Sequence, residues 1–117
     1  MSIFKKRFND LVWKEYSCGD YYTFKNAQVM YGDYVLSIST GNMFHNGEPD
    51  RYEILIRKND VVQHLSIIAK DYLNSTSDGE TVGWLRVDDV CIFMSRMITL
   101  YSNDKHRGVK ESWENNS

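Results

Sequence analysis

The chain has 117 residues, of which 26% are charged and 42% are hydrophobic. This length is typical of a single domain, which can bury about two-thirds of its unfolded surface without a metal or disulfide. The formal net charge of −2 argues against a strongly acidic mimic of nucleic acid and against a strongly basic nucleic-acid coat. These values predict one ordinary globular domain and leave its partner open.

Cysteine usage and the N-terminus bear on where the protein acts. Its two cysteines, Cys18 and Cys91, are fewer than a small secreted scaffold normally carries. Cys91 lies in the apolar run 90–94, which predicts a buried free thiol. The charged residues 1–8 are not followed by the apolar stretch of a secretory signal. Because no run approaches the ~18 apolar residues of a membrane span, we expect a cytoplasmic protein that does not enter a membrane.

The beginning of the chain has a helical pattern. Residues 3–16 are predicted to form a helix, because Phe4, Phe8, Leu11 and Val12 recur at i, i+4, i+7 and i+8 and would share one apolar stripe. The following residues 17–20 include a glycine and are typical of a helix end and a turn.

From residue 20 the apolar residues alternate with a period of two, which predicts strands. In residues 34–39 and 51–57 the alternation directs Tyr34, Leu36 and Ile38, and then Tyr52, Ile54 and Ile56, toward the core. Polar turns are predicted at Gly32–Asp33 and at 58–60. Short links favour antiparallel neighbours. The predicted strands are 20–24, 27–31, 34–39, 51–57 and 61–68, with a short edge strand at 81–85.

A second helix is predicted over residues 87–101, where Val90, Phe93 and Met97 contribute to a wide apolar face. Residues 103–117 are predicted to be a polar C-terminal tail, either disordered or a short docking segment, outside a single domain spanning 1–102. The expected fold class is therefore α+β. We expect an antiparallel meander of four to five strands, flanked by an N-terminal helix and a C-terminal helix.

No spacing of residues in the sequence matches a known catalytic or metal-binding motif. His45 lies close to Glu48 and Asp50, but this spacing matches no metal-binding or acid–base motif. Cys18 could meet His45 or His64 only through the fold, and no local pattern supports such a pair. The sequence therefore predicts a protein that is not an enzyme and holds neither a metal nor a cofactor.

The loop 42–50 is the best candidate for a partner-binding surface. Met43 and Phe44 are large apolar residues among glycine, asparagine and glutamate, so they either fold back onto the core or contact a partner protein. Exposed residues of this kind are natural anchors of an interface. The predicted partner-binding residues are Met43, Phe44 and His45, the basic cluster Lys5, Lys6 and Arg7, and Trp113 of the polar tail.

Single-stranded nucleic acid is the alternative partner. Tyr21, Tyr22, Tyr31 and Tyr34 could form a stacking surface on the open face of the sheet, with basic residues at its rim. The same tyrosines could instead be half-buried strand residues without a role in binding. A homodimer through an edge strand or an apolar helix flank is compatible with either partner.

Part of the chain resembles small accessory proteins encoded by bacteriophages. The resemblance lies in the tyrosine-led strand 52–56, the acidic and glycine-containing segment 78–85, and the helix start at 88–90. It covers residues 51–101, and its shared positions look structural, so no functional residue is carried over. The resemblance implies an inhibitor that binds a host protein, such as a defence nuclease or a transcription factor, in the host cytoplasm.

Overall fold

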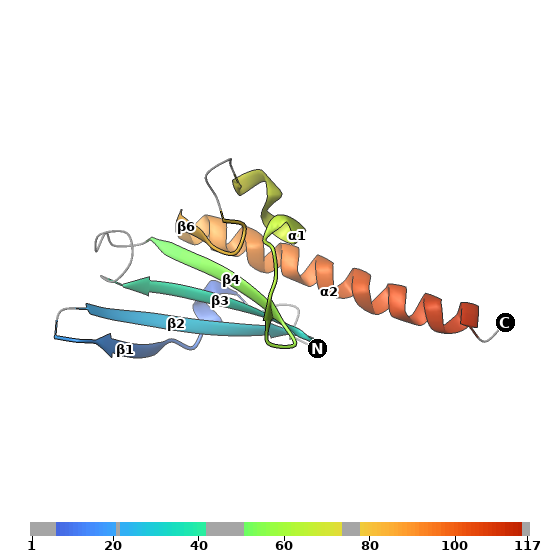
Figure 1. The fold of residues 1–117 in the computed structure, drawn as a ribbon, viewed down its shortest axis with the longest axis horizontal. Coiled ribbons are helices and arrows are strands. Elements are labelled where there is room, and N and C mark those ends of the chain that lie inside the picture. Colours follow the sequence, from blue (N-terminus) through green and yellow to red (C-terminus); the bar gives the residue numbers. More distant parts are fainter. Residues whose placement is uncertain (1–6, 21, 42–50, 74–77, 116–117) are drawn as a thin grey trace.

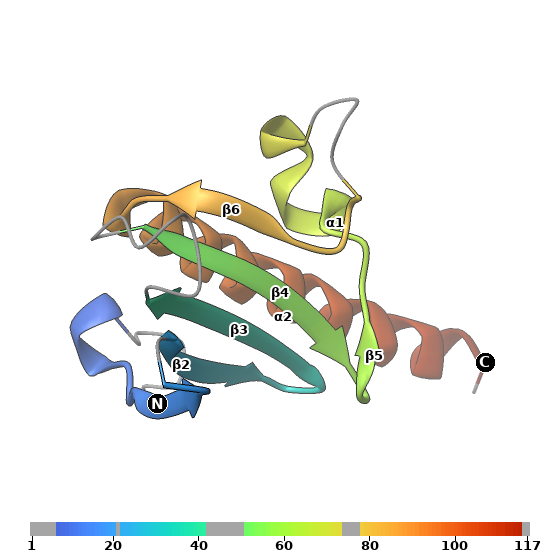
Figure 2. The same ribbon diagram turned by 60° about the vertical axis from the view of Figure 1, so that its left-hand side comes forward.

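The computed structural model describes residues 7–20, 22–41, 51–73 and 78–115, and of residues 18, 22 and 104–115 it describes the backbone alone. The described residues form two layers, a six-stranded antiparallel sheet and the long helix α2 (Val87–Asn115) (Figure 1). Figure 2 shows α2 behind the sheet, so that it covers one face. The predicted α+β class with an antiparallel sheet is confirmed.

The sheet is a meander, and two short strands share one of its edges. Four strands lie in space in their sequence order: β1 (Lys14–Cys18), β2 (Tyr22–Tyr31), β3 (Tyr34–Gly41) and β4 (Tyr52–Lys58). Two short strands, β5 (Val61–Val62) and β6 (Val82–Leu85), both pair with β4, one toward each of its ends. The predicted two-residue turn at Gly32–Asp33 joins β2 to β3, and Gly32 there has a φ of +64°.

Alternate residues of β3 and β4 face α2 and form the centre of the core. The register pairs Leu36 with Ile56 and Ile38 with Ile54, and all four side chains are fully buried. Phe93 is a fully buried member of the same core from α2. The predicted inward faces of these two strands are confirmed, because alternation in a strand sends every second side chain to the same face.

Helix α2 begins where the sequence predicts it. The Asp89 carboxylate accepts a hydrogen bond of 2.9 Å from the backbone N–H of Arg86 just before the helix, and acidic residues are favoured in a first turn. The backbone remains helical as far as Asn115, through most of the predicted tail. Figure 1 shows this end of α2 extending past the sheet. No helix among the described residues is long and apolar enough to cross a membrane.

The predicted N-terminal helix over residues 3–16 is wrong for its described part. Instead, η2 (Phe8–Asp10) is a single 3-10 turn, and β1 then pairs along its whole length with β2. Phe8 packs against Trp13 and Tyr52, with ring centroids 6.1 and 5.4 Å apart. Of the residues that suggested a helical stripe, Phe8 and Leu11 pack against the core, Val12 is 75% exposed, and Phe4 lies outside the described residues.

Two of the predicted strands also differ from the structure. The predicted strand over residues 61–68 is only β5, followed by the short helix α1 (Ser66–Ala69) and the 3-10 turn η4 (Lys70–Tyr72). Leu65 and Ala69, four residues apart, are both fully buried, which is a helical spacing. The predicted strands 20–24 and 27–31 are one continuous strand, β2.

The polar pair inside β2 is accommodated by its neighbours. Lys25 lies 3.6 Å from Glu15 of β1. Asn26 donates hydrogen bonds of 2.9 Å to the hydroxyls of Ser37 and Ser39 on β3. Because both side chains find partners on adjacent strands, polar residues that suggested a strand boundary lie within a strand.

Candidate binding site

The short helix α1 is positioned by its buried side against α2. Leu65, Ile68 and Ala69 are buried, and the backbone N–H of Leu65 donates a 2.6 Å hydrogen bond to the carbonyl of Gly79. Ile67 lies on the other side of this turn and is 41% exposed. The segment 65–69 therefore anchors three side chains in the core and presents Ile67 to solvent.

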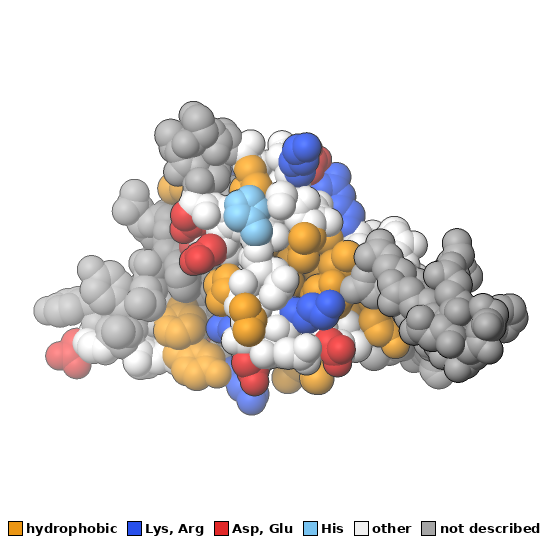
Figure 3. Space-filling model, turned by 45° about the vertical axis from the view of Figure 1, so that its right-hand side comes forward, with side chains coloured by type: hydrophobic (Ala, Val, Ile, Leu, Met, Phe, Trp, Pro, Cys, Tyr) orange, Lys and Arg blue, Asp and Glu red, His pale blue; other side chains and the backbone are white. Residues whose placement is uncertain are grey.

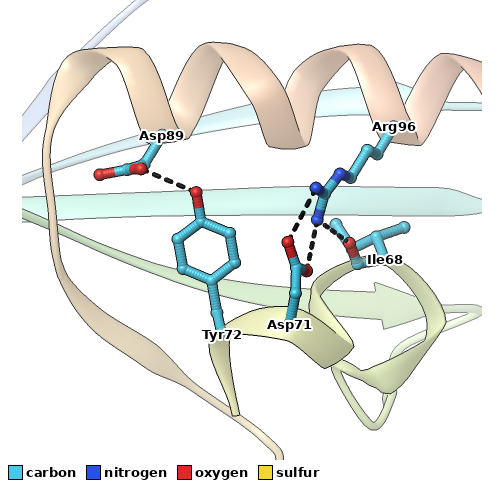
Figure 4. Close-up of polar contacts among 5 residues, drawn as sticks. All are labelled: Ile68, Asp71, Tyr72, Asp89 and Arg96. Carbon is cyan, nitrogen blue, oxygen red and sulfur yellow. Dashed lines mark hydrogen bonds and ion pairs between the residues drawn. The ribbon is translucent and has the colours of Figure 1, made fainter.

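Arg96 of α2 fastens η4 and the end of α1 to the long helix (Figure 4). Its two terminal nitrogens donate to the two carboxylate oxygens of Asp71 at 2.7 and 3.0 Å, and one of them also donates to the carbonyl of Ile68 at 2.8 Å. The guanidinium carbon lies 5.7 Å from the ring centroid of Phe93 and 5.9 Å from that of Tyr72. A bidentate pair of this kind fixes orientation as well as distance.

The electrostatics of this contact follow from its hydrogen bonds. The bond from Arg96 lowers the pKa of the Asp71 carboxyl below its ordinary value, and the bond to Asp71 raises the pKa of Arg96. The Tyr72 hydroxyl donates to the Asp89 carboxylate at 2.8 Å, and this bond raises the pKa of Tyr72. The lowered pKa of Asp71 and the raised pKa of Arg96 both favour the charged forms that make this pair, and η4 is held at two points, by Arg96 and by Asp89.

An open groove of ≈720 Å³ lies between α1 and α2. Its apolar surface comes from Ile67, Ile68 and Leu100, and Lys70 and Arg96 supply cationic groups. Figure 3 shows hydrophobic side chains over this part of the molecule next to basic ones. The full lining is Ser66, Ile67, Ile68, Lys70, Asp71, Arg96, Thr99, Leu100 and Asn103. Such a lining can receive an apolar side chain with a polar rim around it.

A serine–histidine contact beside the groove has a structural explanation. Ser66 Oγ lies 2.9 Å from His64 Nδ1, and the backbone N–H of Ser66 donates to the same nitrogen at 3.2 Å. This is a local contact at the start of α1, of the kind by which side chains satisfy free N–H groups at helix starts. Among the described residues, no cluster of three or more His, Cys, Asp or Glu could hold a metal ion.

Few of the predicted partner-binding residues fall in the described part of the chain. Arg7 is exposed, its backbone N–H donates to the Asp10 carboxylate at 2.9 Å, and it borders a second groove of ≈380 Å³ between η2 and α2. Trp113 falls within α2, but its side chain lies outside the described part. Outside the described residues altogether lie Lys5, Lys6, Met43, Phe44 and His45.

The predicted tyrosine stacking surface is not assembled as expected. Tyr31 is 1% exposed and Tyr34 is 7% exposed, and both belong to the core beneath α2. They cannot stack on nucleic-acid bases in this position. Tyr21 and the side chain of Tyr22 lie outside the described part. Cys91, predicted to be a buried free thiol, is free but partly exposed, in the groove beside η2.

Sequence reasoning missed the residues that shape the α1–α2 groove. Asp71 and Arg96 are 25 positions apart, and no periodic pattern joins them. It also missed Trp84 of β6, which is 55% exposed at a φ of +60°. There, Gly83 and Trp84 together oppose Glu53 in a bulge, and bulges redirect side chains at sheet edges. In the sequence, the glycine before Trp84 was the only indication of this bulge.

No protein family, curated protein or solved structure matches the chain. The arrangement of its own residues therefore carries the functional argument.

Proposed function

We propose that the chain is a non-enzymatic protein-binding module whose α1–α2 groove receives an apolar side chain of its partner. The observation that carries this proposal is Ile67, which is 41% exposed at the margin of a groove with an apolar lining. An exposed aliphatic residue next to a concave apolar surface is typical of a contact centre. Lys70 and Arg96 supply the polar rim.

The hydrogen bonds that hold the walls of the groove in place support its role as a binding surface. Arg96 is held by Asp71 and by the carbonyl of Ile68, and Tyr72 is held by Asp89. Because these bonds set the position of η4 against α2 before any partner arrives, binding loses little conformational entropy on this side. A preorganised surface suits a protein that acts by occupying its partner rather than by transforming it.

The sequence resemblance to phage accessory proteins makes a host protein the partner to test first. In this proposal the chain is a phage-derived inhibitor that occupies a functional surface of a host factor in the host cytoplasm. Single-stranded nucleic acid is the alternative partner, and the burial of Tyr31 and Tyr34 removes two of the four residues on which that alternative depends.

The first experiment captures partners from bacterial lysate with the tagged full chain, with and without nuclease, and measures the affinity of each captured protein after purification. Ile67→Asp places a charge in the groove, whereas Ile92→Asp makes the same change at a residue of α2 that is 40% exposed and does not line the groove. We expect Ile67→Asp to weaken binding by at least about tenfold and Ile92→Asp to leave it unchanged.

Other outcomes assign the interaction elsewhere. If Met43→Ala with Phe44→Ala abolishes binding while Ile67→Asp does not, the loop 42–50 is the contact surface and the groove proposal is wrong. If capture disappears with nuclease and the affinity falls steeply with salt, the partner is nucleic acid, because phosphate contacts release counterions.

A further inference from the structure

Strand β1 occupies an edge of the sheet and has the features of a strand that can pair with a strand of another chain. Among the described strands it pairs only with β2, and its residues 14–17 are all exposed. The other edge is divided between β5 and β6 and interrupted by the bulge at Trp84. An uninterrupted edge strand offers backbone N–H and C=O groups to another strand. We infer that β1 pairs antiparallel with β1 of a second copy, forming a symmetric homodimer.

The side chains of β1 favour a second copy of this chain as the occupant. Tyr16 stacks on Phe24 of β2, with ring centroids 4.9 Å apart and an interplanar angle of 15°. Tyr16 is nevertheless 45% exposed. A two-fold axis at Tyr16 brings the partner's Tyr16 opposite it, so the two stacked pairs become one row of four rings across the dimer. Aromatic cross-strand pairs stabilise antiparallel sheets.

Charge selects this register among the alternatives. Directly opposed residues of an antiparallel pair lie on the same face of the sheet, whereas neighbouring residues of one strand lie on opposite faces. The two-fold axis must therefore pass where a residue opposes its own copy, and not between two residues. An axis at Glu15 sets that carboxylate against the partner's Glu15, and an axis at Lys14 sets two ammonium groups against each other. An axis at Ser17 or at Cys18 sets a residue of β1 opposite Gly19, which has a φ of +71° in the turn after β1, so neither register pairs the whole strand.

The remaining register, with its axis at Tyr16, pairs all five residues of β1. It sets Lys14 opposite the partner's Cys18 and Glu15 opposite the partner's Ser17, so no like charges face each other directly. Glu15 also keeps its contact with Lys25 of its own chain, 3.6 Å away. The two sheets then continue into one, with both α2 helices on the same side.

This dimer leaves the α1–α2 groove accessible. Figure 1 shows β1 at the edge of the sheet away from α1. The inference is therefore independent of the proposed function, and the variants that test one do not touch the other.

Disulfide trapping tests the register directly in the full chain, with Cys18→Ser and Cys91→Ser as background. Directly opposed residues have Cα atoms about 4.5–5.5 Å apart, within the range for a disulfide. We expect Tyr16→Cys to form a covalent dimer on oxidation. The matched control, Glu15→Cys alone, should not cross-link, because diagonal neighbours are about 7–8 Å apart. Mixing Glu15→Cys chains with Ser17→Cys chains should restore cross-linking between the two.

Sedimentation measurements on the unmodified chain test the dimer without a trap. We expect a dimer mass that increases with concentration, and a monomer for Tyr16→Lys with an unchanged circular dichroism spectrum. A monomer for the unmodified chain at every concentration would overturn the inference, as would equal cross-linking at positions 15 and 16. Saturation of β1 by a strand of a different protein, with no self-association, would also overturn it.

Discussion

At the scale of single residues, Tyr31 is buried in a way that lowers the stability of the folded state. Its side chain is 1% exposed, and its hydroxyl is the one buried side-chain polar atom without a hydrogen-bond partner among the described residues. Burial raises the pKa of this phenol from 10.0 to about 12. A buried hydroxyl without a partner destabilises the folded state, since it has lost its hydrogen bonds to water.

Replacing Tyr31 with phenylalanine removes that hydroxyl and keeps the ring. We expect Tyr31→Phe to raise the free energy of unfolding at neutral pH by about 1 kcal/mol. Because the pKa of Tyr31 is higher in the folded state than in the unfolded state, the free energy of unfolding is unaffected by this group below pH 10 and falls as the pH rises from 10 toward about 12. Urea unfolding at neutral and alkaline pH should show a smaller alkaline loss for the variant. Tyr16→Phe, at an exposed position, serves as the control, and an equal alkaline loss in Tyr31→Phe and the unmodified chain would contradict the prediction.

At the scale of elements, the start of α1 and the turn before β6 depend on each other. The His64 ring lies against Gly79, where a Cβ would overlap the ring, and Gly79 has a φ of +81°. The carbonyl of Gly79 accepts the hydrogen bond from Leu65 at 2.6 Å. The position therefore needs glycine both for its backbone conformation and for the close approach of His64.

A double-mutant cycle separates these two requirements. We expect Gly79→Ala to lower the free energy of unfolding by about 1–3 kcal/mol, since alanine at a positive φ is strained and also meets the ring. In a His64→Ala background the loss should be smaller, because only the backbone strain remains. Denaturant unfolding of all four chains gives the coupling energy. Equal losses in both backgrounds would show that the ring does not restrict this position.

The sequence predicted correctly those helices and strands whose own residues show a clear alternation or helical spacing. β3, β4 and α2 follow alternation or helical spacing in their own residues, and the structure confirms them; β6 also lies where a short edge strand was predicted, but a bulge interrupts its alternation. The N-terminal segment and α1 were not predicted correctly, because distant partners decide their structure: Phe8 packs against Tyr52, and Leu65, just before α1, is buried in the core shared with α2. A short apolar segment fits more than one local structure, and its contacts decide which one forms.

At the scale of the whole molecule, the described residues are organised around one core that the sheet and α2 share. The core runs from Leu11, before β1, to Met97 of α2, and it includes residues of β2, β3, β4, β6 and α1. The radius of gyration is 16.1 Å, compared with about 13 Å for a compact chain of this length, which agrees with the extension of α2 past the sheet. Because both layers depend on the same side chains, we expect them to unfold together.

A core truncation tests this shared dependence. Leu36 of β3 is fully buried beneath α2, so we expect Leu36→Ala to lower the free energy of unfolding by about 3 kcal/mol. Unfolding followed by helical circular dichroism and by tryptophan fluorescence should give the same midpoint for the variant. Ile92→Ala, at an exposed position, should change stability by no more than about 0.5 kcal/mol. Separate midpoints for the two signals would show two independent units.

The sequence by itself determined the fold class, strands β3 and β4 and the start of the long helix, because these follow from the alternation and spacing of neighbouring residues. Only the tertiary structure decided that residues 14–18 form an edge strand, that α1 follows β5, and that Arg96 meets Asp71. Each of these depends on contacts that no local pattern shows, such as the pairing of Tyr16 with Phe24 across a hairpin and the contact of Asp71 with Arg96, 25 positions away. The candidate groove belongs to this second group, since its walls come from two helices that no local pattern connects.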